Sequence, residues 1–190
     1  MDPTTRANRT AWEIASRKHV REYDELLAEA RVGGSLTPVE HALLDPLASG
    51  CADLVYTGKG ALIWMPDIGA WALDAARLLR PGGHLFVFEG HPAVPLWTWD
   101  TDRPRIRPDR SYFAPSHLND SFPANGAVER QWTLGRIVTA VADAGLRIRH
   151  LAEHPEPFWR MGGVTAAAWD GRLPNTFSLL ASAPPSTGKD

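Results

Sequence analysis

The sequence predicts an α/β fold, because short apolar strands alternate with amphipathic helices. "ADLVYT" (52–57) and "HLFVFEG" (84–90) are continuously apolar runs of the length of buried strands. Between them, "DIGAWALDAARLLR" (67–80) has the period of a helix, with Asp67 in position to cap its start. Buried strands joined by a helix indicate a parallel sheet with helices on its faces.

The rest of the chain extends this unit on both sides. Residues 8–31 form an amphipathic helix with Trp12 and Ala15 on its apolar stripe, and a short second helix starts at Pro38. After a long aromatic and proline-rich loop (91–131), a helix at 133–146 ends at Gly145, and two strands follow at 147–154 and 176–183. We therefore expect a helical cap at 1–47, an α/β domain at 48–183 and a disordered tail at 184–190.

Composition narrows the classes of function. The chain has 190 residues and a formal net charge of −2, which gives no case for nucleic-acid binding. Its single cysteine, Cys51, excludes an internal disulfide and favours a reducing cytoplasm. No apolar run approaches the roughly 18 residues of a membrane span, so we expect no membrane segment.

The order of these elements carries a resemblance. The run "ADLVYTGKGALIWMPDIGAWALDAARLLRPGGHLFVFEG" resembles the second half of a class I S-adenosylmethionine (SAM) methyltransferase, in which a helix ends at an "LLRPGG" turn before the next strand. "AGLRIRHLAEHPEPFW" and "LPNTFSLLASAP" resemble the last helix and the terminal antiparallel pair of that family. The N-terminal helices resemble its variable substrate-side cap. The resemblance implies SAM as cofactor and methyl transfer to a small-molecule acceptor.

The chain departs from this family before its first strand. A complete member begins with a strand and a Gly-x-Gly-type loop, then a second strand ending in an acid that binds the ribose, and a third that contacts adenine. Nothing between Met1 and Cys51 can be that first strand, so a block of roughly sixty to seventy residues is absent between Leu47 and Ala52. The predicted fold is an incomplete Rossmann-like methyltransferase sheet: two parallel strands (52–57 and 84–89), a C-terminal antiparallel pair, helices on both faces and the N-terminal helical cap.

Three explanations of this gap stay open. The chain carries an internal deletion, natural or engineered; or its sequence is closed up across residues that are not shown; or it is a compact α/β domain outside the family. If most of the SAM site is missing, the alternative function is a catalytically inactive or repurposed protein that acts as a binding or dimerisation module.

Candidate reactive and cofactor-binding residues lie where the two parallel strands end. The resemblance implies that Tyr56, Thr57 and Gly58 contact the methionine end of the cofactor. Glu89 and His91 follow the second strand, where an imidazole or carboxylate could take a proton from the acceptor. The alternatives are that the glycines only shape a turn and that Glu89 and His91 form a solvated polar pair.

Candidate substrate contacts are a lysine and several aromatic residues, which suit an apolar or aromatic pocket. They are Trp12, Lys59, Trp64, Trp97, Trp99, Tyr112 and Trp132. Packing in the core is the alternative for the aromatic members. We expect no metal site, because His150 and His154 lie four apart on a strand and its exit and point awkwardly for one ion.

The resemblance also bears on assembly. In the family's sheet order, the missing strands would leave the 52–57 strand bare on one side, and a bare edge is a template for pairing with another chain. We therefore expect a homodimer, formed through the exposed edge of strand 52–57 or by swapped N-terminal helices.

Overall fold

The structure is a computed structural model, and it describes six ranges of the chain: residues 3–21, 53–98, 105–120, 123–124, 126–157 and 172–185. By its internal contacts the chain divides into two units, Met1–Leu47 with Ser116–Glu129, and Ala48–Pro115 with Arg130–Asp190. The predictions for the helices of residues 22–47, for Cys51, Trp99 and the end of the tail, and for the whole stretch between Leu47 and Ala52, lie outside the described residues.

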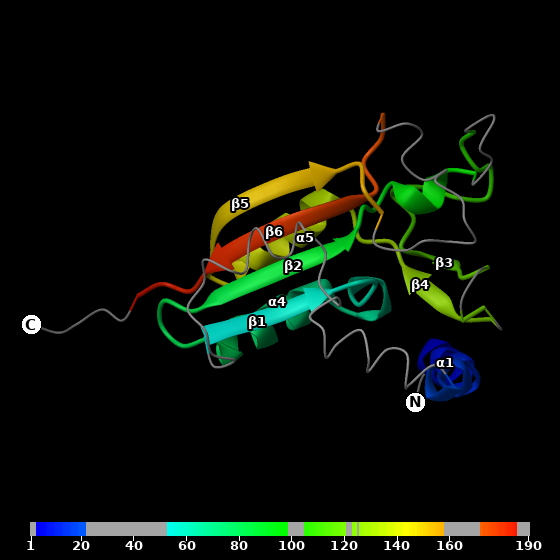
Figure 1. The fold of residues 1–190 in the computed structure, drawn as a ribbon, viewed down its shortest axis with the longest axis horizontal. Helices are drawn as coiled ribbons and strands as arrows, with labels where there is room; N and C mark the ends of the chain where they lie inside the picture. Colours follow the sequence, from blue (N-terminus) through cyan, green and yellow to red (C-terminus); the bar gives the residue numbers. More distant parts are fainter. Residues whose placement is uncertain are drawn as a thin grey trace, which may run out of the picture. The chain divides into compact units, whose positions relative to one another are not determined.

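The second unit is built on a four-stranded sheet with the order β1-β2-β6-β5 (Figure 1). Its strands are β1 (Leu54–Gly58), β2 (His84–Gly90), β5 (Arg147–His154) and β6 (Thr176–Ser182). β1 pairs with β2 in parallel, and β6 runs antiparallel between β2 and β5. The two parallel strands and the antiparallel C-terminal pair predicted from the sequence are confirmed.

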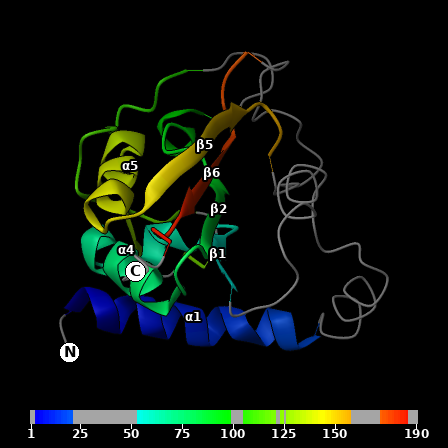
Figure 2. The ribbon, with the colours of Figure 1, turned by 90° about the vertical axis from the view of Figure 1, so that its left-hand side faces the viewer.

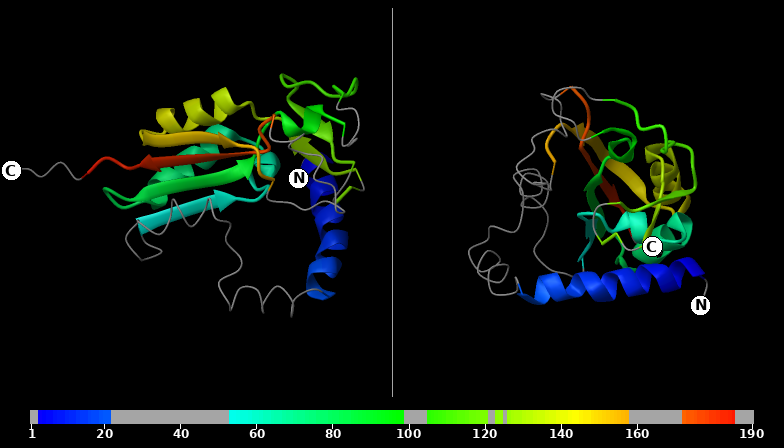
Figure 3. Two further views of the ribbon diagram at one scale, coloured as in Figure 1. Left: turned by 45° about the horizontal axis from the view of Figure 1, so that its top comes forward. Right: turned by 90° about the vertical axis from the view of Figure 1, so that its right-hand side faces the viewer.

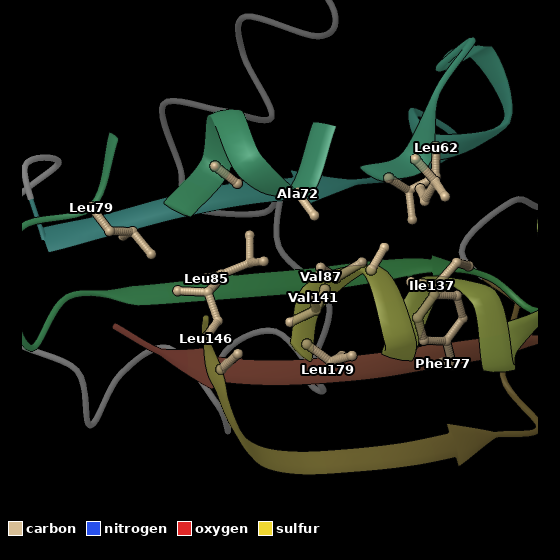
Figure 4. Close-up of a cluster of buried hydrophobic side chains, with 14 residues drawn as sticks. Leu62, Ala72, Leu79, Leu85, Val87, Ile137, Val141, Leu146, Phe177 and Leu179 are labelled. Carbon is tan, nitrogen blue, oxygen red and sulfur yellow. The ribbon is translucent and has the colours of Figure 1, made fainter. Parts of the chain in front are cut away.

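Two helices cover one face of this sheet. α4 (Ile68–Leu78) and α5 (Leu134–Asp143) lie on the same side in Figures 2 and 3. Their buried side chains meet those of β2 and β6 in one hydrophobic cluster, which includes Ala72, Val141, Leu85, Val87, Phe177 and Leu179 (Figure 4). β2 and β6 lie between β1 and β5 within the sheet, and both central strands are almost entirely buried.

The ends of both helices follow from local chemistry. The Asp67 carboxylate accepts from the backbone N–H groups of Gly69 and Ala70, as the sequence predicted for the start of α4. Thr133 caps α5 in the same way through the N–H of Arg136. After α5 the chain turns at Gly145, whose φ of 81° lies in the left-handed region that favours glycine.

The first unit joins a helix to a short hairpin. α1 (Pro3–Arg21) starts five residues earlier than predicted, and β3 (Ser116–Leu118) pairs with β4 (Val128–Arg130). Asn8 Nδ2 donates to the Val128 carbonyl over 3.0 Å, and Val128 N donates to Asn8 Oδ1 over 2.7 Å. Among the side chains of α1 that the structure describes, Ala11 and Ala15 are buried, whereas Trp12, which the sequence places on the apolar stripe, is 36% exposed.

The stretch 91–131 is more ordered than its sequence suggested. It holds the 3-10 helix η3 (Val94–Leu96), an isolated bridge between Trp97 and Ile106, and the strands β3 and β4. The long loop predicted at 91–131 therefore contains short regular elements within its described residues. Prolines and aromatic residues removed any clear periodicity from these three-residue elements, so the sequence pattern could not reveal them.

Candidate functional site

The candidate site is the edge where β1, β2 and β5 end. β1 and β2 are parallel, and β5 runs in the same direction because both β2 and β5 are antiparallel to β6. The arrowheads of the three strands accordingly lie toward one edge in Figure 1. Ligands of open α/β sheets bind outside the carboxyl ends of such strands. The predicted residues 56–59, Glu89 and His91 all belong to this edge.

Glu89 is a buried carboxylate with its oxygens directed at the neighbouring loop. Its side chain accepts hydrogen bonds from Gly60 N (2.7 Å), Ala61 N (2.8 Å) and Leu62 N (3.1 Å). Burial raises the pKa of Glu89, while these N–H groups and that of Gly90 act in the opposite direction. The alternative of a solvated polar pair does not describe this residue, which is 2% exposed.

Two tryptophans hold the same loop at its ends. Trp71 Nε1 donates to Thr57 Oγ1 over 3.2 Å, and Trp132 Nε1 donates to the Met65 carbonyl over 3.2 Å. The Trp132 ring also lies under the Arg136 guanidinium, 4.9 Å from its centroid. The stretch from Thr57 to Met65, which includes the 3-10 helix η2 (Leu62–Trp64), is thus tied to β2, α4 and the start of α5.

His91 is the second residue of the predicted catalytic pair, and it is held in one tautomer. Ala93 N donates to its Nδ1 over 3.1 Å, so in the neutral ring the proton is on Nε2. Nε2 lies 2.8 Å from Glu153 Oε1, although the angles are not those of an aligned hydrogen bond. Burial lowers the pKa of His91, and the nearby Glu153 carboxylate acts in the opposite direction. To accept a proton from a substrate, Nδ1 would have to release the Ala93 N–H.

The same edge contains further polar residues, of which the sequence singled out only His154, as a rejected metal ligand. Glu153 contacts His91, and His154 Nε2 lies 2.8 Å from Ser178 Oγ, which is fully buried. Asn175 donates through Nδ2 to the Pro155 carbonyl. Glu153 could have been found from its position at the end of β5, which runs parallel to β2. The sequence does not reveal this direction of β5, because it depends on β6 lying between β2 and β5.

The predicted aromatic contacts have partners within the protein, several of them backbone groups. Tyr112 Oη accepts from Leu134 N, Trp97 pairs through its backbone with Ile106, and Trp64 is half-buried in η2. Trp12 belongs to the other unit. Lys59 lies in the loop itself with φ 58°. The substrate role of these residues stays a prediction.

A separate polar cluster lies in the first unit. His117 on β3 and Glu129 on β4 are 2.8 Å apart between Nε2 and Oε2, and Asn119 Nδ2 donates to the other Glu129 oxygen over 2.5 Å. Asn119 N bonds to the Ala127 carbonyl, so His117 and Glu129 face each other across the hairpin. The pair was not anticipated, because the hairpin itself was not.

Neither a metal centre nor a membrane segment emerges from the described part of the chain. Within those ranges, no group of three or more His, Cys, Asp or Glu side chains is arranged to hold an ion. The helices of the same ranges include none that is long and apolar enough to cross a membrane.

The contacts of Tyr56, Thr57 and Gly58 test whether these residues alone fit SAM. A side chain at Gly58 would overlap the Tyr56 hydroxyl and lie 2.7 Å from the Phe88 carbonyl, so the space beside this glycine is already filled. The Thr57 hydroxyl accepts from Trp71, and the next amides bind Glu89. These three positions therefore do not make a SAM site by themselves, and the described residues supply no glycine-rich loop or ribose-binding acid in front of them.

Comparison with solved structures agrees with this architecture. A SAM-dependent methyltransferase from Mesorhizobium loti superposes with a TM-score of 0.55 at 23% identity, over 68% of this chain and 61% of that one. The fold is that of the class I SAM-dependent methyltransferases. A putative SAM-dependent methyltransferase from Listeria monocytogenes also gives a TM-score of 0.55, at 16% identity, over 84% of this chain and 75% of that one.

Comparisons of the sequence with protein families and with curated proteins found no match. The chain spans 61% of the length of the Mesorhizobium methyltransferase.

Proposed function

We propose that this protein is a SAM-dependent methyltransferase for a small-molecule acceptor, in which an internal deletion between Leu47 and Ala52 has removed most of the SAM site. The sheet order β1-β2-β6-β5, with its polar carboxyl edge, carries this proposal. It corresponds to the half of the sheet that the sequence resembled. The solved methyltransferases that share the fold support the general activity.

In this proposal the chain's own residues bind and orient the acceptor. Lys59, Trp64, Trp97, Tyr112 and Trp132 would contact it, and Trp99 and Trp12 complete the predicted set. His91 would take its proton at Nδ1 after the Ala93 N–H moves away. SAM, where it is bound, supplies the methyl group, and the protein contributes alignment of the acceptor.

A second function is favoured by one specific observation. The loop amides at 60–62 are already bound by Glu89, and the space beside Gly58 is filled by Tyr56. A chain with these groups occupied could serve as a cofactor-free binding or dimerisation module. Fold alone does not decide between the two functions.

Calorimetric titration with S-adenosylhomocysteine separates them. Binding tighter than about 100 μM, or roughly 5.5 kcal/mol, supports the methyltransferase and argues against the module. Thr57→Val should then weaken binding, whereas Thr139→Val on the exposed side of α5 should not. An absence of heat at millimolar ligand contradicts SAM binding and leaves the module as the function.

We further propose a homodimer through β1 or swapped N-terminal helices, in the reducing cytoplasm that a single cysteine suggests.

A further inference from the structure

The loop after β1 presents four consecutive backbone N–H groups to one neighbouring strand. Lys59 N donates to the Phe88 carbonyl over 2.9 Å. Gly60 N binds Oε2 of Glu89, and Ala61 N and Leu62 N both bind Oε1, over 2.7, 2.8 and 3.1 Å. The three acceptor atoms of these four N–H groups belong to Phe88 and Glu89 of β2, which is paired on both sides. The loop is therefore held from a central strand of the sheet.

The backbone of this loop needs such support. Lys59 has φ 58° and Gly60 has φ 92°, and the left-handed region is unfavourable for a residue with a side chain, such as Lys59. η2 starts immediately afterwards, and its N-cap residue, Ala61, has no side-chain acceptor for the first amides. Glu89 supplies that acceptor from a position 28 residues further along the chain.

The carboxylate gains from the same contacts. A buried charge is costly unless hydrogen bonds replace its water, and three loop amides and the Gly90 N–H do so here. A successive set of backbone N–H groups in a left-handed turn is also the type of concavity that binds anions in other proteins. In this chain a side chain of the protein occupies the concavity.

We propose that Glu89 is a positioning residue whose carboxylate is a built-in anion: it fills the amide concavity of residues 60–62, fixes the loop in its left-handed turn and closes the concavity to external anions. The loop's place beside a bound acceptor rests on the proposed function, whereas its attachment to Glu89 does not. Glu89 then acts on Lys59 and Trp64 through the backbone between them and does not itself exchange a proton with substrate.

Amide hydrogen exchange and ¹H–¹⁵N chemical shifts of residues 60–62 test this role without SAM. In the unmodified protein these three amides should be protected, and formate or inorganic phosphate at millimolar concentration should leave their signals in place. In Glu89→Ala their exchange should quicken at least about tenfold, since each loses a charge-assisted hydrogen bond. Formate should then shift these amides and restore part of the lost protection.

Two variants serve as comparisons. Asp74→Ala removes an exposed carboxylate of α4 and should leave residues 60–62 unchanged, with or without formate. Glu89→Gln keeps the size but loses the charge and one acceptor oxygen, so it should show the same faster exchange if the alanine variant fails to fold.

Several results would overturn the proposal. The first two are unprotected amides at 60–62 in the unmodified protein and unchanged amide signals in both Glu89 variants. The third is a shift of these amides by formate while Glu89 is intact. The fourth is that chloride restores the protection in Glu89→Ala as well as formate does at equal ionic strength. A failure of the chain to bind S-adenosylhomocysteine changes none of these readings, so the two proposals fail separately.

Discussion

His91 gives the clearest pH dependence among the single residues. Burial lowers its pKa from the ordinary value of 6.5, so on acidification the unfolded chain binds this proton before the folded chain does. Its contribution to stability should be complete above about pH 6.5 and should decline as the pH falls from there toward the lowered folded-state pKa. Urea unfolding measured at intervals between about pH 8 and pH 5 should show this loss.

Substitution separates His91 from the other histidines. His91→Gln should flatten that part of the pH profile, whereas His150→Gln, on an exposed position of β5, should keep it. Parallel profiles for the unmodified protein and His91→Gln would contradict the assignment.

For single residues, the sequence predicted the position of the site better than it predicted what each side chain does there. Glu89 and His91 were recognised because they follow an apolar strand, and the structure does place both at the carboxyl edge. The sequence could not show that the Glu89 oxygens bind backbone amides 27 to 29 residues earlier, because that contact depends on the register of β1 against β2. Glu153 was missed because the direction of β5 depends on the position of β6 between β2 and β5.

At the scale of elements, local signals predicted helix ends well. Asp67 was expected to cap α4 and does so with bonds of 2.8 and 3.0 Å. Asp67→Ala should lower the free energy of unfolding by about 1 kcal/mol, because two first-turn amides lose their acceptor. Chemical denaturation followed by far-ultraviolet circular dichroism measures the change.

Asp74 provides the matched control within the same helix. It pairs with the exposed Arg77 at 3.3 Å, and such surface pairs contribute little. Asp74→Ala should stay within about 0.5 kcal/mol of the unmodified protein. Equal losses for the two variants would show that the Asp67 cap adds nothing beyond a surface charge.

Elements without periodicity were the ones that the sequence failed to predict. β3 and β4 have three residues each, too few for an alternating pattern to emerge, and they pair across a turn within a proline-rich stretch. By contrast, β2 and β6 are seven-residue apolar runs, and their bounds were predicted to within one residue. Length and burial, which both strengthen the hydrophobic pattern, account for the difference.

At the scale of the whole molecule, the sheet order bears on assembly. β1 ends the order, and among the described strands it pairs with β2 alone. In complete methyltransferases that the sequence resembles, further strands pair with the strand that corresponds to β1, on the side away from β2. A terminal strand in that position is suited to pairing with a second copy, which would extend the sheet across a two-fold axis.

Light scattering should therefore give a mass near twice the 20.9 kDa of the chain at micromolar concentration. Leu54→Pro provides a test of the edge, since proline is tolerated at the first residue of an edge strand but removes a backbone donor there. This variant should shift the mass toward that of a monomer while its circular dichroism spectrum stays unchanged. A dimer that Leu54→Pro leaves intact points instead to swapped N-terminal helices, and a monomeric unmodified protein contradicts both forms of the dimer.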